Sequence, residues 1–97
     1  MEIFGPVISA IPFTDVEEVI RRGNATTFAL GSGVWTRDVS MAPVGEGLRA
    51  GSAWINCYQA MDPAVPFGGY KQSGWGREMG YEAMELYTEV KAVAAAL

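Results

Sequence analysis

The sequence predicts an α/β fold in which a parallel βαβαβ segment is followed by a long Gly-rich loop, a short helix and a final strand. Three observations support this prediction: apolar runs alternate with amphipathic stretches, the links between them are short, and regular periodicity stops near Tyr58. Strands and helices that alternate over short links are typical of right-handed crossovers on a parallel sheet. Of the 97 residues, 49% are hydrophobic and 19% charged, which is enough apolar material for a folded core.

The first predicted strand spans residues 6–13, an apolar run bracketed by prolines, and we expect it to be buried. A helix should follow, because Thr14 is a good N-cap and Glu17, three residues later, completes a capping box. Gly23 and Asn24 then suit a left-handed exit from this helix. The apolar stripe of the helix consists of Val16, Val19 and Ile20.

The second strand should lie within residues 28–36, centred on Val34 and Trp35. A weak helix is expected to begin near Asp38 or Ser40 and to end at Gly51. It is weak because a proline is tolerated only in its first turn, and each internal glycine costs on the order of 1 kcal/mol relative to alanine. The residues concerned are Pro43, Gly45 and Gly47.

A third strand is predicted at residues 52–57, and it completes the βαβαβ segment. Residues 58–76 have no periodicity and are rich in glycine and proline, so they should form a long irregular loop. Loops of about 15 or more residues in compact proteins are usually functional. A short helix at residues 80–87 and a last strand at residues 88–93 complete the prediction.

Charge and composition exclude several classes of function. Seven basic and eleven acidic side chains give a net charge of −4, which argues against nucleic acid or an anionic membrane as partner. The chain has no histidine, so Ser-His and Cys-His nucleophile pairs cannot form within it, and no metal site is expected. A single cysteine fits a reducing compartment, and no apolar run approaches the ~20 residues of a membrane span, so we expect a cytoplasmic location.

Five blocks of sequence occur in an order and spacing that resemble the aldehyde dehydrogenase superfamily. They are EIFGPV at residues 2–7, WINCY at 54–58, PFGGYKQSG at 66–74, GRE at 76–78 and YTEVK at 87–91. The resemblance implies an oxidoreductase that converts aldehydes to carboxylic acids with NAD or NADP. It also implies that residues 1–87 are the C-terminal portion of the catalytic domain, and that residues 88–97 form an oligomerisation strand and tail.

The resemblance assigns roles to two residues near the cofactor. Glu2 would accept hydrogen bonds from the two hydroxyls of the nicotinamide ribose, since a carboxylate is a good acceptor for a vicinal diol. Phe4 would pack against the nicotinamide side of the pocket. Without the resemblance, Glu2 is simply an exposed acidic residue and Phe4 a core aromatic near a terminus.

The same resemblance assigns Phe67, Met61 and Cys57 to the walls of an apolar tunnel that admits the aldehyde. Such a tunnel favours hydrophobic aldehydes and keeps water from the reacting thioester. On sequence alone, an aromatic residue such as Phe67 is more often a loop anchor than part of a tunnel wall. Cys57 is not expected to be the nucleophile, because the family's catalytic cysteine stands in a glycine-glutamine-x-cysteine block upstream of the part represented here.

The family's nucleophilic cysteine, general-base glutamate and Rossmann-like domain have no counterpart in this sequence. We therefore expect the isolated chain to be inactive, and to bind neither NAD nor NADP usefully. Met1 stands where the family usually has another acidic residue, so the chain is expected to begin inside a motif. The partners expected are an aldehyde substrate in the parent enzyme and other copies of the chain in a homo-oligomer. Two alternatives remain open: a non-catalytic interaction or oligomerisation module, and an unrelated domain that binds a small ligand.

Overall fold

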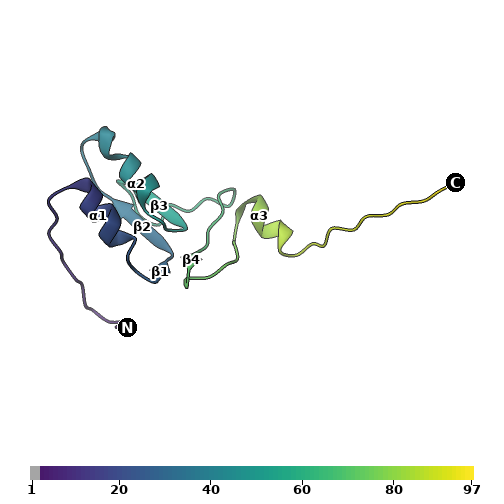
Figure 1. The fold of residues 1–97 in the computed structure, drawn as a ribbon, viewed down its shortest axis with the longest axis horizontal. Helices are drawn as coiled ribbons and strands as arrows, with labels where there is room; N and C mark the ends of the chain where they lie inside the picture. The colour runs from purple at the N-terminus through teal and green to yellow at the C-terminus, as the bar shows by residue number, and fades with distance from the viewer. Residues whose placement is uncertain (1–2) are drawn as a thin grey trace.

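The computed structural model describes residues 3–97. Its helices and strands form a small α/β unit, and an extended segment lies at each end of this unit (Figure 1). The chain measures 69 × 33 × 23 Å, and its last residues run away from the folded part without turning back. The elements are α1 (Val16–Gly23), β1 (Phe28–Ala29), β2 (Gly31–Val34), the 3-10 helix η1 (Val39–Met41), α2 (Pro43–Gly47), β3 (Ser52–Ile55), β4 (Tyr70–Lys71) and α3 (Gly80–Glu85).

The centre of the fold is a parallel pair of strands, as the sequence predicts. β2 pairs with β3 from Gly31 opposite Ser52 to Val34 opposite Ile55, and α2 packs on both strands. Pro43 occupies the first turn of α2, where a missing N–H costs nothing. The core is small: within residues 3–97, Ala29 and Val44 are the buried hydrophobic side chains.

A second, antiparallel pair joins β1 to β4, with Phe28 opposite Lys71 and Ala29 opposite Tyr70. β4 lies inside the stretch that was expected to be wholly irregular, so that part of the prediction is wrong. A side-chain hydrogen bond adds to this backbone pairing: the Ala29 N–H donates to the Ser73 hydroxyl at 2.8 Å. The long loop is thereby tied to the link between α1 and β2.

Helix α1 forms as predicted, but its cap lies one residue further along. Asp15 is the N-cap and accepts the Glu18 N–H at 2.7 Å, while the Glu18 carboxylate accepts the Thr14 N–H at 2.9 Å. The expected left-handed exit at Asn24 is wrong, since this residue has φ −82°. Its side chain instead joins two segments: Nδ2 donates to the Gly47 carbonyl at 2.8 Å, and Oδ1 accepts the Arg49 N–H at 2.7 Å.

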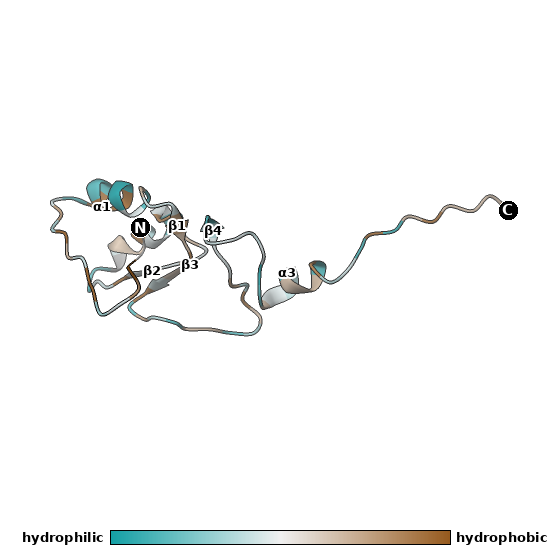
Figure 2. Ribbon diagram, turned by 90° about the horizontal axis from the view of Figure 1, so that it is seen from below, coloured by the Kyte–Doolittle hydropathy of each residue, from teal (hydrophilic) through white to brown (hydrophobic). Residues whose placement is uncertain are grey.

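Two predicted strands are absent from the described residues. Residues 6–13 are extended but unpaired, and Ile8 is 93% exposed; residues 88–93 are likewise unpaired, and Val90 is fully exposed. Both segments have strand-forming residues, but a strand also needs a neighbour for its backbone hydrogen bonds. Figure 2 shows the hydrophobic colouring of the N-terminal segment, in contrast to the hydrophilic α1.

Several other strands and helices are shorter than predicted. The second strand is divided into β1 and β2 and ends at Val34, which leaves Trp35 outside it, and the third strand ends two residues before Cys57. The last helix ends at Glu85 instead of Tyr87. Among residues 3–97, no helix is long and apolar enough to span a bilayer.

Candidate functional site

Met61 and Phe67, which the resemblance to a family assigns to an aldehyde tunnel, lie together in the structure. Both line a cavity of about 310 Å³, which we call the aromatic cavity, and both also line an adjoining cavity of about 290 Å³. The aromatic cavity is lined by Leu30, Gly31, Trp54, Tyr58, Gln59, Met61 and Phe67. Its walls therefore come from β2, β3 and the long loop.

Trp54 forms the wall that belongs to β3. A side chain on Gly31 would come within 2.8 Å of the Trp54 ring, so only glycine leaves room for the indole at this place on β2. The indole Nε1–H donates to the Ala60 carbonyl at 3.0 Å, which fixes the turn after β3. The Trp54 and Tyr58 ring centroids are 5.0 Å apart at an interplanar angle of 59°, a tilted arrangement that aromatic pairs favour.

The loop that carries Phe67 is held by its own backbone. Phe67 and Glu78 exchange two N–H to carbonyl hydrogen bonds of 2.7 Å each. The Arg77 guanidinium lies 5.3 Å from the centre of the Tyr70 ring and donates to the Gly69 carbonyl at 2.9 Å. The start of β3 approaches this loop closely, since a side chain on Gly51 would collide with the Gly68 carbonyl.

Phe4 and Cys57, two other predicted site residues, do not line this cavity. Glu2 lies outside the described residues. Phe4 is 90% exposed with φ 48°, in the extended N-terminal segment, and it lines neither of the two cavities. Cys57 is an exposed free thiol that also lines neither of them, and its place in a tunnel wall stays a prediction.

The aromatic cavity has no charged side chain among its lining residues. A site of this kind favours uncharged, apolar ligands, because it offers no ion partner for a charged group. Sequence reasoning missed Leu30, Gly31 and Trp54 as lining residues. Burial alternates along residues 52–55 in the structure, but the sequence Ser-Ala-Trp-Ile has no matching alternation of polar and apolar residues that could have signalled it.

Two carboxylates have perturbed acidity, and both lie away from the cavity. The pKa of Glu18 is lowered from its ordinary value of 4.5. The largest cause is a hydrogen bond from the Thr14 N–H and the next is a hydrogen bond from the Thr14 hydroxyl, while the positive charges of Arg22 and Arg21 add to the effect. Hydrogen bonds from the Ser40 hydroxyl and backbone lower the pKa of Asp38. Over residues 3–97, no group of three or more His, Cys, Asp or Glu side chains is placed to hold a metal ion.

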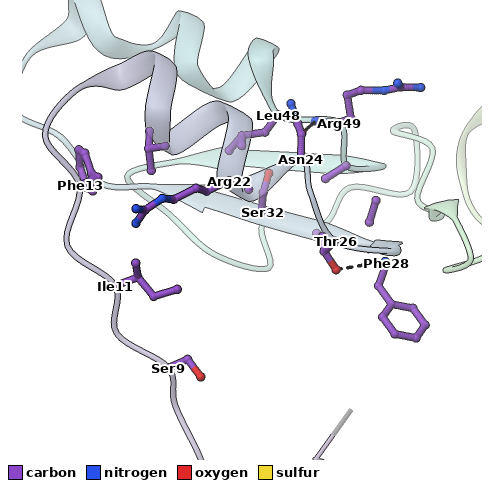
Figure 3. Close-up of a pocket in the computed structure, with 15 residues that line it drawn as sticks. Ser9, Ile11, Phe13, Arg22, Asn24, Thr26, Phe28, Ser32, Leu48 and Arg49 are labelled. Carbon is purple, nitrogen blue, oxygen red and sulfur yellow. Dashed lines mark hydrogen bonds between the residues drawn. The ribbon is translucent and has the colours of Figure 1, made fainter. Parts of the chain in front are cut away.

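A larger opening of about 420 Å³ lies between the N-terminal segment and the folded part, and we call it the apolar groove (Figure 3). Ile11 and Phe13 line one side of it, and Phe28 lines the other. No prediction from the sequence concerned this groove. Its remaining lining residues are Ser9, Val19, Arg22, Gly23, Asn24, Thr26, Ala29, Gly31, Ser32, Leu48, Arg49 and Ala50.

Comparison with known proteins gives a consistent result. The model of the aldehyde dehydrogenase family matches residues 1–93. Aldehyde dehydrogenase 1 of Tanacetum cinerariifolium is 56% identical over 93 residues, which are 95% of this chain and 19% of that protein. The 4-trimethylaminobutyraldehyde dehydrogenase of Oryzias latipes is also 56% identical over 93 residues, 95% of this chain and 18% of that protein.

Solved structures are similar over the same extent. An NAD+ complex of an aldehyde dehydrogenase from Bacillus cereus has a TM-score of 0.89 and 51% identity, covering 96% of this chain and 19% of that one. An indole-3-acetaldehyde dehydrogenase mutant from P. syringae, in complex with NAD+ and IAA, has a TM-score of 0.87 and 46% identity, covering 94% of this chain and 19% of that one. The chain thus spans about a fifth of the length of these relatives.

Proposed function

Because the chain belongs to the aldehyde dehydrogenase family, we propose that it forms the C-terminal part of an oxidoreductase that oxidises aldehydes to carboxylic acids with NAD+ or NADP+. Residues 1–87 are then the end of the catalytic domain, and residues 88–97 are the oligomerisation strand and tail. The observation that carries the proposal is the meeting of Met61 and Phe67 in one uncharged, aromatic-lined cavity. The NAD+ complexes of similar enzymes support the choice of cofactor.

The aromatic cavity is proposed to hold the organic part of the aldehyde. Phe67 and Trp54 offer flat apolar surface to the substrate, and Met61 has a flexible thioether that adapts to its shape. Burial of this surface excludes water from the neighbourhood of the reacting carbonyl, which protects a thioester intermediate from uncontrolled hydrolysis. Hydrophobic aldehydes are therefore the proposed substrate class.

The N-terminal segment is proposed to face the cofactor. The Phe4 ring is 90% exposed, so its face is free to pack against a flat heterocycle, which fits the nicotinamide. Glu2 would accept hydrogen bonds from the ribose hydroxyls and so orient the ring that receives the hydride. These two contacts position the cofactor, and binding of its remaining parts would depend on residues elsewhere in the enzyme.

Cys57 is proposed to be a structural neighbour of the tunnel and not the nucleophile. The family's nucleophile and general base have no counterpart in the 97 residues, so the isolated chain should not oxidise aldehydes. It should also fail to bind NAD usefully, because about 1.5–3 kcal/mol from one charged contact does not offset an association cost of about 4 kcal/mol or more. Calorimetry with NAD+ should therefore show no micromolar binding.

Replacement of the matching stretch of the Bacillus cereus enzyme by these 97 residues tests the proposal. The hybrid should reduce NAD+ in the presence of an apolar aldehyde, and Phe67→Asp in the hybrid should raise KM strongly, because the ligand would meet an unpaired charge. Glu82→Gln, an exposed position on α3, is the matched control and should change little. A folded hybrid that binds NAD+ but turns over no aldehyde would refute the proposed role.

A second candidate is a non-catalytic interaction or oligomerisation module derived from this family. The observation that favours it is the C-terminal tail, which is extended and exposed from Thr88 to Leu97. Such a tail can add a strand to the edge of another sheet. The hybrid enzyme separates the two candidates, because a module without a catalytic role would not restore turnover.

A further inference from the structure

Gln59 brings a carboxamide to the aromatic cavity, whose walls are otherwise mostly apolar. The other polar side-chain groups there are the Tyr58 hydroxyl and the indole N–H of Trp54, which already donates to the Ala60 carbonyl. A carboxamide has an oxygen that accepts hydrogen bonds and an amino group that donates them. Among residues 3–97, no group forms a hydrogen bond with the Gln59 carboxamide. Its hydrogen-bonding capacity is therefore available to a ligand.

The backbone on both sides of Gln59 is held by hydrogen bonds. On the N-terminal side, the Asn56 side chain pairs with the Thr36 backbone: Nδ2 donates to the carbonyl and Oδ1 accepts the N–H, each at 2.8 Å. On the C-terminal side, the Trp54 indole holds the Ala60 carbonyl at 3.0 Å. Gln59 itself has φ 54°, in the left-handed region that glutamine seldom adopts. Such conformations persist where the surroundings hold them, and they are frequent at ligand sites.

The position of the carboxamide makes it sensitive to the chemistry of the ligand. Gln59 is exposed and also lines the cavity, so it lies at the rim, where water satisfies its polar atoms in the absence of a ligand. A ligand made only of hydrocarbon displaces that water and replaces none of its hydrogen bonds. A ligand with a hydroxyl at the same place restores them. The rim therefore discriminates between two ligands with the same apolar body.

We propose that Gln59 is a specificity-determining residue, which selects aldehydes whose apolar body carries a neutral hydrogen-bonding group, such as a hydroxyl, distant from the carbonyl. The inference rests on the proposed function, because it assumes that the cavity holds the organic part of an aldehyde. Trp54 and Phe67 contact the apolar body, and the Gln59 carboxamide oxygen accepts the hydrogen bond of the hydroxyl. Charged aldehydes are disfavoured, since no charged side chain lines the cavity.

The test uses the hybrid Bacillus cereus enzyme and two aldehydes that differ by one hydroxyl, phenylacetaldehyde and para-hydroxyphenylacetaldehyde. The methylene between ring and carbonyl keeps the reactivity of the two carbonyls alike. The hybrid should have the higher kcat/KM for the hydroxylated aldehyde, and Gln59→Met should reduce this preference about threefold to tenfold, because methionine has a similar length but loses the hydrogen bond. The change should be in KM and not in kcat, since the contact is distant from the reacting carbonyl.

Gln72→Met is the matched control. Gln72 is the other glutamine of the chain, it is exposed, and it lines neither the aromatic cavity nor the adjoining one, so the preference should be unchanged. Gln59→Glu keeps an accepting oxygen and should retain the preference, which separates the loss of a hydrogen bond from a disturbed turn. An unchanged preference in Gln59→Met, or equal losses in Gln59→Met and Gln72→Met, would overturn the proposal.

Binding of unreactive analogues distinguishes this inference from the proposed function. The alcohols obtained by reducing the two aldehydes have the same apolar bodies but cannot be attacked at a carbonyl. Calorimetry should show that the hydroxylated alcohol binds the hybrid more tightly, and that Gln59→Met removes this advantage. A hybrid with this binding preference that oxidises neither aldehyde would support the role of Gln59 and refute the proposed catalytic role. A hybrid that oxidises both aldehydes without preference would overturn the role of Gln59 and keep the proposed function.

Discussion

Lys71 connects two parts of the chain that are far apart in sequence. Its ammonium donates to the Asn24 carbonyl at 2.9 Å and to the Thr26 carbonyl at 3.0 Å, which anchors β4 to the end of α1. Hydrogen bonds from a charged donor contribute about 1.5–3 kcal/mol each, and their loss leaves two carbonyls without a donor. Lys71→Met should therefore lower the free energy of unfolding in urea by about 2 kcal/mol or more.

Lys91→Met is the control for this substitution, because Lys91 lies in the exposed tail and has no hydrogen-bond partner within residues 3–97. It should leave the urea midpoint unchanged. Equal effects of the two substitutions would mean that the contacts of Lys71 do not contribute to stability.

Glu18 makes the stability of α1 depend on pH. Its pKa is lowered in the folded chain, chiefly by the Thr14 N–H, so it contributes stability above its unfolded value of 4.5 and loses that contribution as pH falls through the folded pKa. Acidification from about pH 6 to about pH 3 should therefore reduce helical circular dichroism more in the unaltered chain than in Glu18→Gln. Asp38, whose pKa is also lowered, is unchanged by this substitution and contributes equally to both profiles. Identical pH profiles would contradict the assigned cause.

Helix α2 is weakened by two glycines whose surroundings differ. A methyl group on Gly45 would lie 3.6 Å from Ile55, an ordinary contact, whereas one on Gly47 would lie 2.9 Å from Ile20. Gly45→Ala should stabilise the chain by about 0.5–1 kcal/mol, because alanine has less conformational entropy to lose. Gly47→Ala should give a smaller gain or a loss, since Ile20 must move. Thermal unfolding of both variants measures this, and a larger gain from Gly47→Ala would contradict the packing argument.

The elements that the sequence predicts well are those with local signals. Helix α1 has a cap and an apolar stripe, and the pairing of β2 with β3 follows from two apolar runs joined by a weak helix. The antiparallel pairing of Phe28 with Lys71 has no local signal, because it joins segments more than forty residues apart. Residues 6–13 and 88–93 have the composition of strands, but composition does not supply the neighbour that a strand needs.

The residues of the candidate site, like the elements of the fold, could be predicted from the sequence only in part. The resemblance to a family assigns Met61 and Phe67 to one tunnel wall; the structure places both residues in one cavity, and their role there stays a prediction. Trp54 was missed, because its role depends on the absence of a side chain at Gly31 on the neighbouring strand. Such a contact between two strands is a tertiary property, and the sequence alone does not reveal the register that creates it.

At the scale of the whole molecule, the exposed apolar surface leads to the last prediction. Ile3, Ile8 and Phe13 are each more than half exposed, as are Val90, Val93 and Leu97 at the other end. Without a partner, the chain should self-associate, because the free edge of β2 and the extended segments can pair with other copies. The net charge of −4 opposes self-association only weakly, because salt at physiological concentration screens electrostatic repulsion over a Debye length of about 8 Å.

Light scattering at micromolar concentration should therefore show oligomers or aggregates, and added salt should not dissolve them, because burial of apolar surface drives the association. Ile11→Asp should raise the share of monomer, since the charge would disfavour a strand from another copy in the apolar groove. A monodisperse monomer that unfolds cooperatively would show instead that the 97 residues are a self-sufficient domain. That outcome would favour the interaction module over a part of a catalytic subunit.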